Sequence, residues 1–324
     1  MTQLPADAEN SAVLVPPAQN GRASATSSSS SARTSKSKKK KEKKRGNKRG
    51  KKKKAQPEPS YTAKTADKYE LYQLAVQSPE EDLKFLERVY KKKNGRRPVH
   101  LREDFCGTAL LCATWIGMRP NNTAEGFDID PEPVKWGAER HFAELGDDAA
   151  RATIHLKDAR EASDKPADFR CAHNFSYCIF HTREEFKDYL QKVYDDMAPG
   201  GMFSIDMHGG PESMYEMEEV REIEEGYDYV WHQDRYWPAT AEYRTAISFR
   251  FPDGTELDRC FKYKWRLWTL PEIKDMLHEV GFASVDSYWE GTDEDGESGD
   301  GVFKKSKRGE NCLSWITYLI GFKE

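Results

Sequence analysis

The stretch VHLREDFCGTALLCATWIGMRPNNTAEGFDIDP, from Val99 to Pro131, decides the fold. It predicts a strand over 99–103, a turn at Gly107, a helix, and a second strand over 124–128 that ends at Asp128. A glycine in the turn lets the backbone pass close to a ligand, and the next helix points its free N–H groups at the same place. An acid ending the second strand can accept hydrogen bonds from both hydroxyls of a ribose. This order indicates a cleft for an adenosine-containing cofactor.

Alternating strands and helices continue beyond this stretch, which is typical of a parallel sheet with helices on both faces. The region 227–268 breaks the pattern, because it reads as antiparallel strands, and we interpret about 211–268 as an insert. An acidic, glycine-rich loop is expected between the last two strands. The further strands are predicted over 152–156, 169–174, 202–207, 282–289 and 314–322.

The N-terminal 60 residues differ in composition from the rest of the chain. They hold 16 Lys and Arg against 4 Asp and Glu, whereas residues 61–324 hold 35 against 51. Such a segment buries too little apolar surface to offset its chain entropy, so we predict that 1–60 is disordered. Its run Lys38–Lys54 is typical of an electrostatic arm for RNA, DNA or another polyanion. A solubilising or targeting tail with no specific partner is the alternative.

Residues 61–98 are predicted to form a helical lid ahead of the main domain at 99–324. One short helix is expected over Asp67–Val76. A longer helix begins with Ser78 as its cap and a proline in the first turn, and it ends at Gly95.

The six cysteines contain no CxxC pair and no zinc-ligand spacing, so we predict a reduced protein without a metal site. There is no apolar run long enough to predict a membrane span, and the first residues lack the layout of a secretory signal. A cytoplasmic protein is expected. A nuclear or nucleolar location is the alternative in a eukaryote, because the lysine run would serve there as a targeting signal.

Six motifs occur in an order that resembles the class I S-adenosylmethionine-dependent methyltransferases, and the small-molecule or glycine N-methyltransferase-like branch in particular. The resemblance covers about 99–324. It implies an α/β fold with a Rossmann-like, doubly wound sheet of seven strands, parallel with an antiparallel last strand, and an antiparallel insert after strand five. The motifs are REDFCGTA (102–109), AEGFDIDP (124–131), HLKDAR (155–160), DFRCAHNFSY (168–177), DMAPGGMFSID (196–206) and RLWTLPEIKDMLHEVGF (266–282).

The same resemblance implies S-adenosylmethionine as the cofactor. It places Glu103, or Asp104 beside it, at the amino acid end of the cofactor, and Asp158 at the amino group of the adenine. Two positions depart from the family pattern, because Phe105 and Ala109 stand where glycines are usual. The residues expected to contact the cofactor are Glu103, Asp104, Cys106, Gly107, Asp128, Ile129, Asp158, Ala159 and Asn174.

The acceptor of the methyl group is expected beyond the carboxyl ends of the strands, where ligands of such sheets bind. His208 and His173 are candidate bases because a neutral imidazole can remove a proton near neutral pH. Asn174 is a candidate for orienting the nucleophile. Histidines and tyrosines near these strand ends and on the lid are candidates for contacting the substrate, namely Tyr69, Tyr72, Tyr177, His181 and His208.

The predicted function is therefore transfer of a methyl group by direct displacement to nitrogen or oxygen of an unidentified acceptor. A small molecule is favoured over a protein side chain, and that over RNA; the oligomeric state is not predicted. A nicotinamide-dependent oxidoreductase is one alternative, but its fingerprint requires glycines at Phe105 and Leu110 as well as Gly107. A non-catalytic cofactor-binding protein with a nucleic-acid-binding tail is the other.

Overall fold

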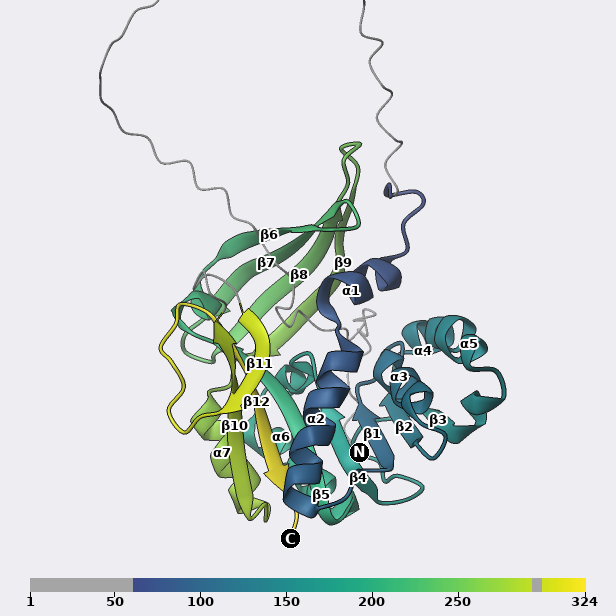
Figure 1. Cartoon of the computed structure of the whole chain (residues 1–324). Coiled ribbons are helices and arrows are strands. Elements are labelled where there is room, and N and C mark those ends of the chain that lie inside the picture. Colours follow the sequence, from purple (N-terminus) through teal and green to yellow (C-terminus); the bar gives the residue numbers. More distant parts are fainter. Residues whose placement is uncertain (1–60, 293–298) are drawn as a thin grey trace, which may run out of the picture.

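The computed structural model describes residues 61–292 and 299–324 (Figure 1). The predicted tail, including Lys38–Lys54, lies outside the described residues. The larger of two sheets has the strand order β11-β10-β12-β5-β4-β1-β2-β3. Its strands are β1 (His100–Asp104), β2 (Thr123–Asp128), β3 (Ala152–Leu156), β4 (Ala167–Ala172), β5 (Met197–Gly209), β10 (Ser284–Thr292), β11 (Gly299–Lys305) and β12 (Trp315–Phe322).

The five strands from β1 to β5 are parallel, and β12 runs antiparallel to β5, as the sequence predicts. The predicted count of seven strands is wrong by one. Residues Gly299–Lys305, which we expected to be part of a loop, form β11 and pair antiparallel with β10 at the edge of the sheet. The chain gains an edge strand there because the residues after the acidic segment return along β10.

Two helices precede the first strand, and the other helices lie between strands along the chain. The predicted ends of the lid helices are largely confirmed, since Asp67 caps α1 with its side chain and Gly95 ends α2 in the left-handed conformation. The predicted cap at Ser78 is wrong in detail, because its side chain makes no capping hydrogen bond. The helices are α1 (Lys68–Val76), α2 (Pro79–Asn94), α3 (Leu110–Met118), α4 (Pro131–Gly137), α5 (Ala143–Leu145), α6 (Arg183–Asp196) and α7 (Leu270–Glu279).

A second sheet of four antiparallel strands follows β5, as predicted, and Figure 1 shows it beyond one end of the larger sheet. Helix α1 packs against it: the ring of Tyr72 lies 5.3 Å from that of Phe261, and the Tyr227 hydroxyl donates to the Leu71 carbonyl at 2.8 Å. The ring of Phe85 on α2 lies 5.3 Å from that of Tyr318 on β12, so residues 61–98 contact both sheets. The strands are β6 (Met217–Ile223), β7 (Tyr227–Trp237), β8 (Glu242–Arg250) and β9 (Glu256–Arg266).

One face of the larger sheet, called the polar face below, carries a buried network of charged side chains around β1 and β4. Arg102 on β1 and Arg170 on β4 are fully buried and adjacent in register, and both bind Asp104 and Asp196. Each also donates to the carbonyl of Ala159, at 2.7 and 2.8 Å. Residues 157–166, which connect β3 to β4 without a helix, are held on this face by the two arginines. This network explains an arginine inside a buried strand.

Among the described residues, no helix combines the length and the apolar character that crossing a bilayer requires.

Candidate functional site

The turn after β1 keeps the backbone of a glycine-rich loop with only one glycine. Phe105, Gly107 and Ala109 have φ values of 55°, 53° and 53°, all in the left-handed region. A residue with a Cβ pays about 1–2 kcal/mol for that conformation, so the surrounding structure must enforce it at Phe105 and Ala109. Conformational strain of this kind gathers at ligand-binding segments. Phe105 and Ala109 therefore adopt a backbone conformation that glycine adopts more readily.

Asp128 fixes this loop from the end of β2. Its carboxylate accepts hydrogen bonds from the N–H of Gly107 at 2.7 Å and from that of Asp130 at 2.8 Å. The side chain is buried, and burial raises the pKa of Asp128 to about 6. Beside it the apolar side chain of Ile129 is 61% exposed. A carboxylate next to an uncovered apolar surface suits a ribose carrying a flat base.

Three carboxyl groups, of which those of Glu103 and Asp206 belong to buried residues, surround a small cavity at the ends of β1, β4 and β5. The cavity of about 20 Å³ is lined by Asp82, Glu103 and Asp206 together with His173 and Asn174. Burial raises the pKa of Glu103 to about 8, that of Asp206 to about 7 and that of Asp82 to about 6. Such a concentration of carboxyl groups attracts a cation, and an ammonium group entering the cavity would restore their charge.

The raised pKa of Glu103 predicts that the free energy of unfolding falls as pH rises. The folded protein keeps a proton up to about pH 8 that the unfolded chain, with a pKa near 4.5, has already released. The contribution of Glu103 to the free energy of unfolding is therefore fully present below about pH 4.5 and is lost as pH rises towards 8. Melting curves of the ligand-free protein from pH 5 to 8 should show this decline. Glu103→Gln should make it less steep and leave the contributions of Asp206, Asp82 and Asp128. An identical decline in the variant would contradict the assignment.

Asp104 and Ala159, two of the residues predicted to contact the cofactor, contact the buried arginines Arg102 and Arg170. Glu103 and Asp104 are neighbours on a strand, so their side chains point to opposite faces. Glu103 accepts from the Cys112 N–H on the cavity side, whereas Asp104 is fully buried between the two arginines and Tyr189 on the polar face. The Asp104 side chain therefore points away from the cavity that Glu103 lines. The Ala159 carbonyl is likewise occupied by both arginines.

The other predicted cofactor residues lie along the same edge. Asp158 is half-exposed and bound at both carboxylate oxygens by Arg160, which lowers its pKa. Cys106 is buried with its sulfur against Gly126, and its backbone N–H donates to the Phe127 carbonyl at 3.0 Å. The N–H groups of Asn174 and Phe175, both left-handed, donate to Asp206 at 2.6 and 2.9 Å.

Helix α4 supports the loop through a glycine. A methyl group at Gly137 would lie 2.0 Å from the carbonyl oxygen of Thr108, so Gly137→Ala must displace the loop or the helix. We expect a loss of about 1–3 kcal/mol in the free energy of unfolding, the usual result of overpacking. Gly117→Ala in α3 is the control, because its nearest neighbour would lie 4.0 Å away and alanine favours a helix. Urea denaturation measures both; equal stabilities would contradict the close contact.

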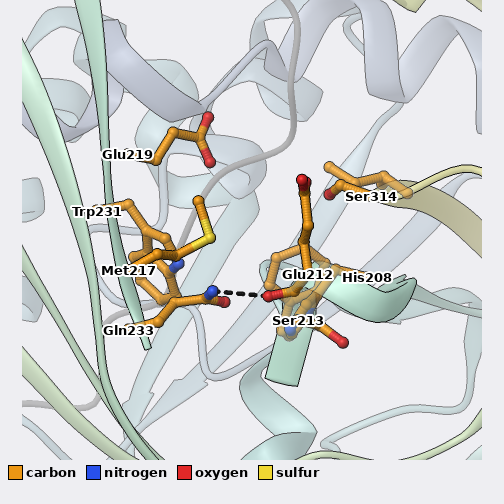
Figure 2. A pocket seen from close by; sticks show the side chains of 10 residues that line it. His208, Glu212, Ser213, Met217, Glu219, Trp231, Gln233 and Ser314 are labelled. Carbon is orange, nitrogen blue, oxygen red and sulfur yellow. Dashed lines mark hydrogen bonds between the residues drawn. The ribbon is translucent and has the colours of Figure 1, made fainter. Parts of the chain in front are cut away.

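A second cavity, of about 70 Å³, lies further along β5 and β12, where Phe175 after β4, His208 and Ile316 line it (Figure 2). His208 lines it beside Phe175, with ring centres 4.5 Å apart. Its Nε2 lies 3.3 Å from the Tyr243 hydroxyl, its Nδ1 has no hydrogen-bond partner in the described structure, and burial lowers its pKa to about 4. The other lining residues are Glu212, Ser213, Met217, Glu219, Trp231, Gln233, Ser314 and Ile316.

The remaining predicted catalytic and substrate residues do not line this second cavity. His173 faces the first one and approaches Ser204 at 3.1 Å, and burial lowers its pKa to about 3. His181 lies at the ends of β8 and β9 against Glu242 and the Lys264 carbonyl. The predicted tyrosines pack in the core: Tyr69 and Tyr72 contact the ring of Phe261, and Tyr177 stacks on Phe186.

Sequence reasoning missed several residues of the two cavities. Asp206 lies near the carboxyl end of β5, as Asp128 lies at that of β2, and this similar position could have identified it. Asp82 arrives from α2, and the Tyr318 hydroxyl donates to it at 2.6 Å across 236 residues of chain. Glu212 and Glu219 come from the segment after β5 and from β6. No local pattern in the sequence assigns Asp82, Glu212 or Glu219 to a cavity at the strand ends.

The fold was compared with known proteins. No protein-family model matches the chain, and no curated protein matches its sequence. Solved structures do match. An S-adenosylmethionine-dependent methyltransferase from Clostridium acetobutylicum has a TM-score of 0.58 and 17% identity, over 76% of this chain and 93% of that chain. DesVI of Streptomyces venezuelae has a TM-score of 0.56 and 15% identity, over 79% of this chain and 97% of that chain.

CalS10 of Micromonospora echinaspora, an amino pentose methyltransferase with bound S-adenosylmethionine, is also similar. Its TM-score is 0.55 and its identity 15%, over 80% of this chain and 98% of that chain. The three structures are matched over nearly their whole length. The described part of this chain therefore has the fold of the class I S-adenosylmethionine-dependent methyltransferases.

Proposed function

We propose that the protein is an S-adenosylmethionine-dependent methyltransferase that acts on nitrogen or oxygen of a small molecule. The observation that carries this proposal is that two cavities share the same strand ends. Asn174 lines the carboxyl-rich cavity, and the next residue, Phe175, lines the second one. On β5, Asp206 and His208 are divided between them in the same way. A methyl donor bound in the carboxyl-rich cavity and an acceptor bound in the second cavity would meet at these residues.

The residues on the first side fit the cofactor. Asp128 would accept hydrogen bonds from the ribose, Ile129 would lie against the adenine, and Glu103 with its neighbouring carboxyl groups would attract the ammonium of the amino acid end. S-adenosylmethionine supplies a methyl group on a sulfonium, and transfer forms a bond from the acceptor to the methyl carbon while the electron pair of the broken C–S bond stays on sulfur. The similarity to CalS10, which binds this compound, supports the same choice.

In the second cavity, we propose that residues of the chain align the acceptor with the methyl group. Nucleophilic displacement at an activated methyl group needs the acceptor held in line more than it needs a strong base. His208, kept neutral by burial, offers an unpaired Nδ1 that can accept a hydrogen bond from the acceptor. We assign His208 to this role, and we do not retain His173, Tyr69, Tyr72, Tyr177 or His181.

Calorimetric titration and thermal shift of the full chain test the proposal. We expect S-adenosylhomocysteine to bind and to raise the melting temperature. At a ligand concentration of 100 times the Kd, binding adds about 2.7 kcal/mol to the free energy of unfolding. NAD is the matched control and should do neither, because Phe105 and Leu110 stand where its fingerprint requires glycines. Binding of NAD in place of S-adenosylhomocysteine would overturn the proposal in favour of the oxidoreductase.

A further inference from the structure

The second cavity carries an uneven distribution of charge. Figure 2 shows Glu219 on the wall formed by β6 and β7, and Glu212 on the opposite wall with His208 and Ser213. Both are acidic side chains, and no Lys or Arg occurs among the described residues that line the cavity. The cavity therefore presents two negative charges to whatever enters it.

The surrounding groups leave these carboxylates free. The nearest cation along β6, Arg221, donates to the Ala75 carbonyl and lies 5.0 Å from the ring of Tyr229, so α1 and β7 hold it elsewhere. The Gln233 amide donates to the Glu212 and Tyr215 carbonyls of the backbone, at 2.9 and 3.0 Å. Within the described structure neither carboxylate has an ion-pair partner, so a ligand cation has no competitor.

The uncharged part of the lining also suits a cation with an apolar body. The ring of Trp231 lines the cavity with Met217, and aromatic rings attract cations electrostatically. Next to the lining residues Ser213 and Ser314, the chain exposes three large apolar side chains: Met214 at 47%, Tyr215 at 57% and Leu313 at 65%. The two segments touch, because the Glu212 N–H donates to the Leu313 carbonyl at 3.1 Å. They offer an apolar surface near the cavity.

From this arrangement we infer that the acceptor is a small amine that is cationic in water, carries an apolar group and has no carboxylate. The inference rests on the proposed function and narrows it. The ammonium form binds between the carboxylates, loses one proton to water, and the neutral amine reacts through its lone pair. A carboxylate on the acceptor would face Glu212 and Glu219 without a compensating cation. Amino acids such as glycine are therefore excluded as acceptors.

The experiment uses the full chain, radiolabelled S-adenosylmethionine and three acceptors with one skeleton. The probes are phenethylamine, phenylalanine, which adds a carboxylate, and 2-phenylethanol, which replaces the amine by a hydroxyl. We expect methylation of phenethylamine with a kcat/KM at least 100-fold above that of the other two. Phenylalanine as the preferred acceptor would overturn the inference, and so would equal rates for the three.

Charge-removing variants assign the effect to the cavity. Glu212→Gln and Glu219→Gln together should raise the KM for phenethylamine at least tenfold and leave the Kd of S-adenosylhomocysteine unchanged. Glu222→Gln, on the opposite face of β6, is the matched control and should change neither value. An unchanged KM in the double variant would also overturn the inference.

The same measurements separate the two proposals. If S-adenosylhomocysteine binds but phenethylamine neither binds nor is methylated, the amine inference is wrong and the methyltransferase proposal stands. If S-adenosylhomocysteine does not bind, the proposed function is wrong.

Discussion

Asp128→Asn lowers the affinity for S-adenosylhomocysteine at least 100-fold. The carboxylate of Asp128 accepts hydrogen bonds from the Gly107 and Asp130 N–H groups, so it both shapes the loop and would face the ribose. An amide has only one acceptor oxygen, and its NH₂ group would oppose one of the two buried donors. An unsatisfied buried donor costs about 1–3 kcal/mol, and hydrogen bonds to a charged acceptor are roughly twice as strong as neutral ones.

Calorimetric titration of the variant against the original protein measures the loss. Asp147→Asn is the matched control, since this exposed acid lies in the turn before β3 and touches neither the loop nor the cavities. Its affinity should equal that of the unchanged protein. If Asp128→Asn keeps full affinity while remaining folded, the ribose does not bind at the end of β2.

Arg170→Leu costs about 3–5 kcal/mol in the free energy of unfolding. Removing one partner of a buried ion pair leaves the other charge without compensation in a medium that solvates it poorly. Here the guanidinium is fully buried and bound to Asp104 at 2.7 Å, to Asp196 at 3.0 Å and to the Ala159 carbonyl at 2.8 Å. Leucine satisfies none of these three acceptors.

Urea denaturation at neutral pH measures this effect. The control is Lys187→Leu, which breaks the exposed pair with Glu279 and should cost less than about 1 kcal/mol. A cost for Arg170→Leu as small as that of the control would show that the network contributes little. Since the network holds residues 157–166, we also expect weaker binding of S-adenosylhomocysteine to the folded variant.

Much of the fold could be predicted because its signals are local. The parallel strands mostly alternate with helices along the chain, and each strand overlaps its expected range. Strand β11 was missed because GDGVFKK combines two glycines and two lysines in seven residues, and only its pairing with β10 makes it a strand. Pairing is a tertiary property that propensity does not contain.

The candidate site was predictable where backbone geometry decides it. The alternation of side chains along a strand could have separated Glu103 from Asp104 and paired Asp104 with Arg102 on one face. The left-handed turn at Phe105 and Ala109 could not be predicted, because neither residue favours that conformation without the surrounding structure. The acids of the second cavity depend on how the insert folds back over β5.

The paired arginines of the polar face have a practical consequence for handling the protein. Dissolved ions screen charges at the surface within about 10 Å at 0.1 M, but they reach buried charges much less. The contacts of Arg102 and Arg170 are fully buried, so their strength should change little with ionic strength. Purification of the protein at high ionic strength should therefore leave this half of the sheet intact.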